Sequence, residues 1–147
     1  MSMDSNIRGN CFCGAVRFEL VPPTEFASHC HCEDCRKSHS AAFVTWTSVP
    51  SAQFKLLSGK DEVRRYQSHP GVYWGFCSKC GSSMFYDADD TPGRIYVTVV
   101  SLVDALDREP DSHMSFEERM SWYPASRTLP CFRGKTEERM EESTRAR

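Results

Sequence analysis

The chain has 147 residues, of which 39% are hydrophobic and 26% are charged, and its formal net charge is −2 at pH 7. This length is enough for one domain with a hydrophobic core, and the composition is that of an ordinary globular protein. The small negative charge and the scattered lysines and arginines argue against partners such as nucleic acid or an anionic membrane surface. No apolar run approaches the ~20 residues that a membrane span needs.

Residues 1–7 are predicted to form an N-terminal tail, and the first ten residues contain no apolar segment of the kind that a signal peptide carries. We therefore expect the protein to be cytoplasmic. The cytoplasm is reducing, so clustered cysteines there more often bind metal or do chemistry than form disulfides. For the eight cysteines of this chain, metal binding is thus the favoured interpretation and disulfides are the alternative.

Alternating, aromatic and β-branched segments predict about seven short strands separated by turn residues. In chain order, these strands cover residues 15–21, 42–49, 54–57, 62–67, 72–76, 83–86 and 94–102. Only residues 33–39 (EDCRKSH) and the short amphipathic stretch 115–123 (SFEERMSWY) favour helix. The sequence therefore predicts one mainly β domain at residues 8–133. The charged segment 134–147 is interpreted as a flexible, solvated tail.

Two cysteine pairs are each followed directly by a glycine, in residues 11–14 (CFCG) and 77–81 (CSKCG). A glycine at this position lets the backbone take a positive φ and turn its amide hydrogens toward the sulfurs, as in a zinc knuckle. Two knuckles supply four ligands, so we predict a closed structural zinc site at Cys11, Cys13, Cys77 and Cys80. The alternative is that the four thiols are buried and hold no metal.

A second group of three cysteines lies within residues 30–35, where a strand end is expected to run into a turn. Its members are Cys30, Cys32 and Cys35. Three protein ligands with an open fourth position are typical of catalytic zinc. The positive charges of Arg36 and Lys37, which follow directly, favour the thiolate form. Two alternatives stay open: a histidine closes the site as a fourth ligand, or the cluster is a set of reactive thiols without metal.

Other residues are candidates by type alone. The candidates for acid–base chemistry are His31, His39 and His113, although a histidine in a small β domain is more often an ordinary surface or core residue. The candidates for a pocket wall are Phe43, Trp46, Tyr73 and Trp74, although strand aromatics are first of all core candidates. Cys131 falls outside both groups, and we interpret it as a spare or partly buried thiol.

The order C-x-C-G, then H-C-x-C-x-x-C-R-K, then F-C-x-x-C-G resembles the glutathione-dependent formaldehyde-activating enzyme family, also called the CENP-V/GFA domain. The resemblance covers roughly residues 8–123 and continues in "LLSG" (56–59), "PGVYWGFCSKCGSSMFY" (70–86) and "VTVVSLVDA" (97–105). One departure is the stretch Ser38-His39-Ser40, since members often carry a glycine close after the C-R-K run.

The resemblance implies a mainly β, Mss4-like β-tent fold of short antiparallel strands around a structural zinc held by the four knuckle cysteines. It also implies a second, catalytic-type zinc, more weakly bound, on Cys30, Cys32 and Cys35. The implied activity is carbon–sulfur lyase-type chemistry on a glutathione adduct of an aldehyde, such as S-hydroxymethylglutathione. Arg36 and Lys37 are then candidates for pairing with the carboxylates of glutathione, and the protein is expected to be a monomer or a homodimer.

Two other classes of function stay open at this point. The first is a zinc-stabilised interaction module without catalysis, since the Mss4-like fold also serves binding proteins. The second is a redox or metal-handling protein that uses the three cysteines as thiols. The presence of the three-cysteine group favours an enzyme, because a binding module of this fold needs only the four-cysteine site.

Overall fold

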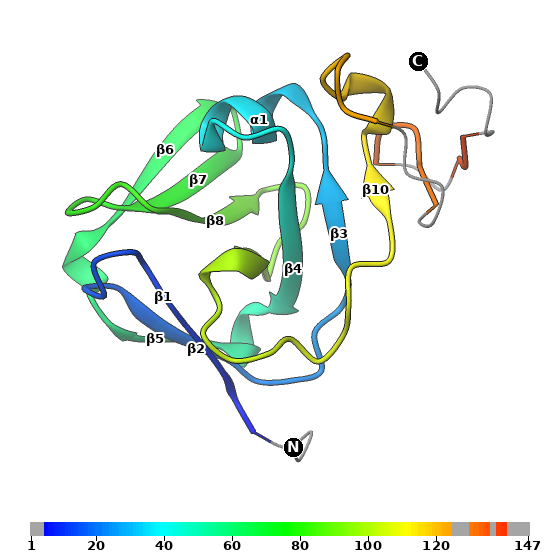
Figure 1. Cartoon of the computed structure of the whole chain (residues 1–147). Helices are drawn as coiled ribbons and strands as arrows, with labels where there is room; N and C mark the ends of the chain where they lie inside the picture. The colour runs from blue at the N-terminus through cyan, green and yellow to red at the C-terminus, as the bar shows by residue number, and fades with distance from the viewer. Residues whose placement is uncertain (1–4, 125–129, 136–137, 141–147) are drawn as a thin grey trace. The chain divides into compact units, whose positions relative to one another are not determined.

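The computed structural model describes residues 5–124, 130–135 and 138–140, which form ten short strands, one α-helix and four 3-10 turns (Figure 1). The strands are β1 (Ile7–Asn10), β2 (Arg17–Leu20), β3 (Ala27–Cys30), β4 (Val44–Pro50), β5 (Phe54–Ser58), β6 (Val63–His69), β7 (Val72–Cys77), β8 (Ser83–Ala88), β9 (Arg94–Thr98) and β10 (His113–Met114). The helix is α1 (Glu33–His39), and the 3-10 turns are Ser51–Gln53, Lys60–Glu62, Val99–Ser101 and Phe116–Glu118. The prediction of a mainly β protein is confirmed.

Contacts between residues divide the chain into two compact units. Unit 1 contains the chain up to Phe26 and residues Thr47–Arg108, and unit 2 contains Ala27–Trp46 and the chain from Glu109 onward. A single domain at residues 8–133 therefore stays a prediction. The predicted tail lies mostly outside the described residues, and of its described residues Met140 is buried. Among the described residues, no helix has the length and apolar character that a membrane crossing requires.

Unit 1 is built from antiparallel strand pairs. Strand β2 lies between β1 and β5, and strands β6, β7, β8 and β9 follow one another side by side, with the end of β4 next to β9. Its core consists of buried side chains from several of these strands, among them Phe18, Met84 and Phe85. The Phe18 ring packs against the rings of Phe54 and Phe85, at centroid distances of 5.8 and 5.1 Å. Cys11 and Cys77 are buried in this same core, so core packing fixes two of the predicted ligands.

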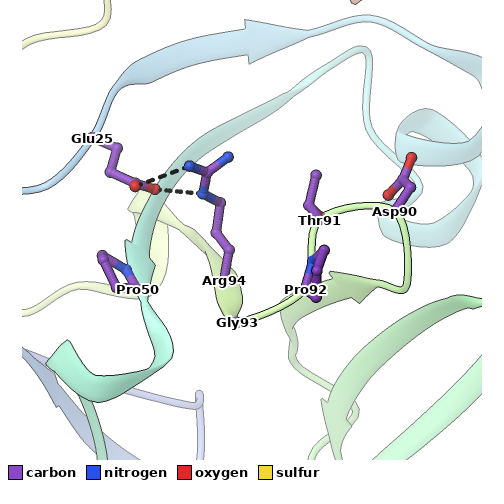
Figure 2. A pocket seen from close by; sticks show the side chains of 7 residues that line it. All are labelled: Glu25, Pro50, Asp90, Thr91, Pro92, Gly93 and Arg94. Carbon is purple, nitrogen blue, oxygen red and sulfur yellow. Dashed lines mark hydrogen bonds and ion pairs between the residues drawn. The ribbon is translucent and has the colours of Figure 1, made fainter.

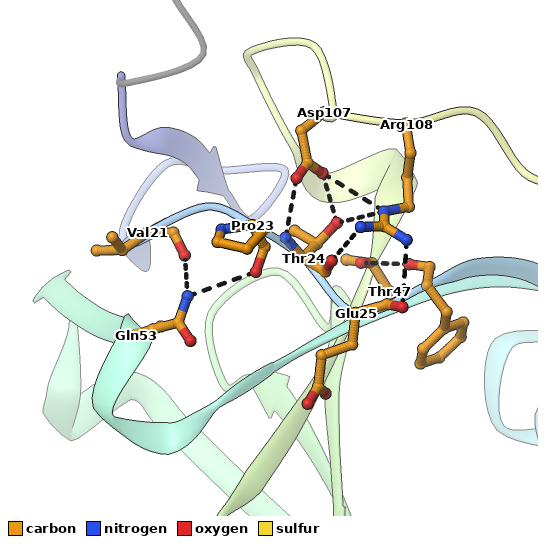
Figure 3. Close-up of polar contacts among 9 residues, drawn as sticks. Val21, Pro23, Thr24, Glu25, Thr47, Gln53, Asp107 and Arg108 are labelled. Atoms are coloured by element: carbon orange, nitrogen blue, oxygen red, sulfur yellow. Dashed lines mark hydrogen bonds and ion pairs between the residues drawn. The ribbon is translucent and has the colours of Figure 1, made fainter.

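A polar network fixes the irregular segment that follows β2 (Figure 3). The Thr24 N–H donates to Asp107 Oδ2 at 2.9 Å, and Arg108 Nε donates to Thr24 Oγ1 at 3.0 Å. Gln53 Nε2 donates to the Val21 carbonyl at 2.6 Å. Residues 21–25 form no strand, so these side chains satisfy backbone groups that no strand partner reaches. The network therefore has a structural role within unit 1.

Unit 2 places β10 parallel to β3, so that Met114 pairs with Cys30, and the first residues of β4 lie on the other side of β3. Two residues, His31 and Cys32, separate the end of β3 from the start of helix α1. Cys32 is its N-cap residue, and Ser40, whose φ of 50° is left-handed, is its C-cap residue. The prediction of helix at residues 33–39 is confirmed.

The prediction of helix at residues 115–123 is wrong except for one 3-10 turn, Phe116–Glu118. Ser115 has a left-handed φ of 50°, and Arg119 has an extended ψ of 156°. Phe116 is fully buried with Cys131 and Met140, and its N–H donates to the Phe132 carbonyl at 3.1 Å. Tertiary pairing thus overrides the amphipathic pattern of this segment.

The strand predictions need corrections of length, such as 15–21 to Arg17–Leu20, and three additions. The strand predicted at residues 94–102 ends at Thr98, because Ser101 Oγ donates to the Thr98 carbonyl at 2.8 Å and turns the chain. The sequence did not predict strands β1, β3 and β10. Strand β10 has only two residues, which is too short to show any alternation.

Candidate functional site

Seven of the eight cysteines gather into two clusters, and in each cluster the Sγ atoms lie within 4.8 Å of one another. The knuckle cluster, in unit 1, consists of Cys11, Cys13, Cys77 and Cys80. The triad cluster, in unit 2, consists of Cys30, Cys32 and Cys35. These are the two groups that the sequence predicts. Cys131 belongs to neither cluster and is fully buried beside Phe116 and Met140.

The spacing of sulfurs in the knuckle cluster fits a tetrahedral metal. Cys13 Sγ lies 3.6 Å from Cys11 Sγ and 3.9 Å from Cys77 Sγ. Four sulfurs at about 2.3 Å from a zinc ion are about 3.8 Å apart, because this distance is the edge of the tetrahedron. A disulfide would need about 2.05 Å. The cluster can therefore hold one metal ion as a closed four-thiolate site.

The two glycines of the knuckles adopt the conformation that the spacing predicts. Gly14 has a φ of 79° and Gly81 a φ of 76°. The turns are equivalent in their hydrogen bonds, since the N–H of the first cysteine donates at 3.0 Å to the carbonyl five residues later, Val16 in one turn and Ser82 in the other. The Val16 N–H donates to Cys11 Sγ at 3.2 Å. Each turn therefore aims backbone donors at sulfur, as a knuckle does.

Ser82 connects the two knuckles. The Phe12 N–H, from the first knuckle, donates to Ser82 Oγ at 2.9 Å, and Ser82 Oγ lies 3.2 Å from Cys80 Sγ. Hydrogen bonds from the Ser82 hydroxyl and backbone lower the pKa of Cys80 to about 5. Cys80 is thus disposed to be a thiolate, the form that binds metal.

The triad cluster sits where β3 runs into α1. Cys30 is the last residue of β3, Cys32 is the N-cap residue of α1 and Cys35 lies within the helix. The Cys35 N–H donates to Cys32 Sγ at 3.3 Å. Among the described residues, no histidine, carboxylate or further cysteine joins the three sulfurs as a ligand. The cluster can therefore hold a metal ion with a position left for another ligand.

The three thiols of the triad cluster differ in their pKa values. Hydrogen bonds from Cys30 and then Cys35 lower the pKa of Cys32 to about 2. The hydrogen bond to Cys32 raises the pKa of Cys30 to about 11, and the pKa of Cys35 is raised by its contacts with Cys30 and Cys32. Without a metal, the negative charge therefore rests on Cys32. A cation at the cluster would allow the other two to ionise.

The two basic residues after the triad lie in different settings. Arg36 Nε donates to the His31 carbonyl at 3.0 Å, which braces the turn between Cys30 and Cys32. Lys37 Nζ lies 2.9 Å from Glu33 Oε1, and the Lys37 side chain is 76% exposed. An exposed ion pair of this kind holds the side chain only weakly. Contact of either residue with glutathione stays a proposal.

The histidines lie beside the triad cluster and do not join it. His31 is fully buried, and its Nε2 lies 2.8 Å from His113 Nδ1, while its ring packs against Phe116 and Tyr123. Burial, followed by the charge of His113, lowers the pKa of His31 to about 3, so its imidazole is neutral at physiological pH. His39 lies in the last turn of α1, with Nδ1 3.2 Å from the Cys35 carbonyl oxygen.

The four candidate wall aromatics divide between the units. Phe43 packs against His29 and His31, and Trp46 donates its indole N–H to Cys35 Sγ at 3.4 Å. Trp74 and Tyr73 belong to unit 1, where Trp74 Nε1 donates to Ser68 Oγ at 2.8 Å. The sequence does not reveal the contact of Trp46 with a triad sulfur, because the two residues belong to different predicted elements.

A surface hollow of about 330 Å³ lies in unit 1, lined by Glu25, Pro50 and residues 90–94 (Figure 2). Arg94 Nε lies 2.7 Å from Glu25 Oε2, so a cation that faces the hollow is already paired. The lining includes no cysteine and no histidine. We therefore place the candidate chemistry at the cysteine clusters and not in this hollow.

The family of this chain follows from its similarity to known proteins. Residues 6–119 match the family model described as glutathione-dependent formaldehyde-activating enzyme. The chain belongs to this family. Its members have the Mss4-like fold, in agreement with the mainly β structure and with two cysteine clusters that can hold metal. The resemblance carried by the cysteine order is thereby confirmed.

Individual relatives agree with this placement. A protein of Halomonas elongata, named for glutathione-dependent formaldehyde activation, is 27% identical over 146 residues, covering 92% of each chain. An uncharacterized lyase of Schizosaccharomyces pombe is 31% identical over 78 residues, covering 53% of this chain and 55% of its own. The crystal structure of a Rhodobacter sphaeroides protein matches with a TM-score of 0.57 at 24% identity, covering 69% of this chain and 92% of that one. The last match shows a shared fold alone.

Proposed function

We propose that this protein is a zinc-dependent enzyme with carbon–sulfur lyase-type activity on a glutathione adduct of an aldehyde, such as S-hydroxymethylglutathione. The observation that carries the proposal is the triad cluster, which groups three sulfurs at one strand–helix junction without a fourth ligand among the described residues. Family membership supports glutathione as the thiol and an aldehyde adduct as the substrate class.

We propose that the two clusters have different roles, one structural and one catalytic. The knuckle cluster has four sulfurs with tetrahedral spacing, so it would hold a closed structural zinc. The triad cluster has three, the number typical of a catalytic site. A zinc ion held by three thiolates would supply an open position for a soft sulfur ligand and lower the pKa of a thiol that binds there.

The chain's own residues hold the triad in place. The Cys35 N–H bonds to Cys32 Sγ and fixes the N-cap sulfur, while Arg36 braces the turn through the His31 carbonyl. Lys37 follows Cys35 by two residues in the same helix and keeps an exposed ammonium group, which would attract the carboxylates of glutathione. The proposed role of the protein in binding is therefore to place a sulfur ligand at the triad and an anionic group near Lys37.

A non-catalytic interaction module is the alternative that the triad cluster disfavours, because the knuckle cluster alone would stabilise such a module. A thiol-redox protein would use the same three sulfurs, but it would not need metal. Glutathione binding that depends on both metal and Cys35 separates the enzyme from the other two classes.

Calorimetric titration of glutathione tests the proposal directly. We expect the zinc-loaded wild type to bind glutathione, to release a proton on binding and to bind more weakly at pH 6 than at pH 8, because the thiol must be deprotonated. Cys35→Ser should not bind, whereas Asp34→Asn, an exposed position in the same helix, should bind like the wild type. Equal binding by the wild type and Cys35→Ser, or binding by neither, would contradict the proposal.

A further inference from the structure

The side chain of Trp46 hydrogen-bonds to a sulfur of the triad cluster. Its indole Nε1 lies 3.4 Å from Cys35 Sγ, within the range of a hydrogen bond to sulfur. Each of the two residues is only 6% exposed. The indole nitrogen is a donor with no acceptor capacity, so the direction of this bond is fixed, from nitrogen to sulfur.

Within the part of the chain that the structure describes, each sulfur of the cluster receives an N–H donor, but the donors differ in kind. Cys30 takes a backbone hydrogen bond from Cys32, and Cys32 takes one from the backbone of Cys35 at 3.3 Å. Cys35 takes its bond from the Trp46 side chain. Substitution can therefore remove the donor to Cys35 while the two backbone donors stay in place.

The position of the indole ring is fixed by packing. Trp46 lies in β4, and its ring meets the edge of the His39 ring at 5.3 Å, with an angle of 89° between the ring planes. His39 is in the last turn of α1 and contacts the Cys35 carbonyl. The donor is thus held toward the sulfur by contacts that do not depend on a metal.

A donor of this kind has two physical effects on a sulfur ligand. It orients the sulfur, and it draws electron density from a thiolate that is buried away from water, where a hydrogen bond is electrostatically stronger. Outer-shell partners of metal ligands typically contribute 10–100-fold to metal affinity. A buried thiolate without any donor would instead carry the desolvation penalty of an unpaired charge.

We propose that Trp46 is a positioning residue of the triad metal site, whose indole N–H holds Cys35 Sγ toward the metal and reduces the charge on that ligand. This inference rests on the proposed function, since it requires that the triad cluster hold a metal ion. It assigns to Trp46 a role toward one sulfur that a phenyl ring of similar shape could not fill.

The first test is Trp46→Phe in the full chain, with Trp74→Phe as the matched control. Trp74 is also a buried tryptophan whose indole N–H donates, but to Ser68 and not to a cysteine. Cobalt(II) replaces zinc, and the spectrum of Cys32→Ser is subtracted to isolate the triad contribution. We expect Trp46→Phe to shift the sulfur-to-cobalt charge-transfer band to lower energy and to weaken cobalt binding about tenfold. Trp74→Phe should change neither.

The second test uses the unsubstituted chain, so it holds even if Trp46→Phe fails to fold. With cadmium-113 in the triad cluster, a scalar coupling between the metal and the Trp46 indole proton should be detected across the hydrogen bond. An absent coupling with cadmium bound there, or an unshifted charge-transfer band in Trp46→Phe, would overturn the inference while leaving the metal site intact. No metal at the triad of the wild type would overturn both the inference and the proposed function.

Discussion

The sulfur of Cys13 lies 3.9 Å from the sulfur of Cys77, although the two residues are 64 positions apart in the sequence. One belongs to the turn between β1 and β2, and the other ends β7. A metal ion bound to both would join two distant parts of unit 1. The knuckle cluster is therefore expected to contribute to folding itself, as structural zinc sites do.

Cys80→Ser should destabilise the protein strongly. The substitution removes one of the four proposed ligands. Structural zinc binds to small zinc-finger peptides with a favourable free energy of ~10 kcal/mol or more. We expect the melting temperature to fall by about 10 °C or more and the soluble yield to drop, with chelation of the wild type having a similar effect. Differential scanning calorimetry with metal analysis measures both.

Lys79→Ala is the control for that prediction, because Lys79 lies between the two cysteines of the same turn and its side chain is 61% exposed. It should melt within about 2 °C of the wild type. A Cys80→Ser protein with normal stability and full metal content would contradict a closed site at the knuckle cluster.

Two glycines should respond differently to alanine. A Cβ at Gly9 would lie 2.3 Å from Cζ of Phe18, whose ring is fully buried against Phe54 and Phe85 and has no room to move. Gly9→Ala should therefore cost about 3 kcal/mol of unfolding free energy. A Cβ at Gly81 would meet nothing within 4 Å. Gly81→Ala should therefore lower the unfolding free energy by only about 1 kcal/mol, because alanine is strained at the positive φ of 76°. Urea denaturation gives both values, and the reverse ranking would contradict the packing described.

The ion pair between Arg8 and Asp104 should make stability depend on pH. Three Arg8 donors, its backbone N–H, Nε and a terminal guanidinium nitrogen, bond to the Asp104 carboxylate at 2.8–2.9 Å. The side-chain hydrogen bond from Arg8 lowers the pKa of Asp104 to about 2. Because the folded pKa is below the unfolded value of about 3.9, this stabilisation is present above about pH 4 and is lost as the pH falls toward 2.

Asp104→Asn isolates that contribution. Its urea midpoint should be lower than that of the wild type by the same amount at pH 7 and pH 5, and the difference should shrink between pH 4 and pH 3. A difference that stays constant down to pH 3 would show that the charge of Asp104 is not responsible.

Much of the fold could be predicted because alternation is a local property. The segments that contain β6, β7 and β8 alternate between apolar and polar residues or carry aromatic residues. Turn residues lie at both ends of these segments. Strand β3 (ASHC) lacks such a pattern, since its pairing with β10 depends on a segment more than 80 residues away, as the register of His29 with His113 shows. The pattern at residues 115–123 is misleading for the opposite reason. Burial of Phe116 against Cys131 decides the conformation there.

The grouping of the cysteines at the candidate site was predictable, but the contacts around them were not. Cysteine spacing predicts both clusters, because a knuckle turn brings its own two sulfurs together. The contacts that support the ligands are between distant elements: Trp46 with Cys35, and His31 with His113 at a separation of 82 residues. No local pattern in the sequence encodes such contacts, so only the structure shows which tryptophan and which histidines surround the triad cluster.

Metal analysis of the freshly purified wild type beside Cys32→Ser tests the central claim, that the triad cluster is an open metal site separate from the structural one. We predict two zinc ions per chain in zinc-loaded wild type and one in Cys32→Ser. The melting temperature of Cys32→Ser should stay within about 3 °C of the wild type, because the triad cluster spans only six residues and joins no distant strands. One zinc per chain in both proteins, unchanged by the substitution, would contradict the claim.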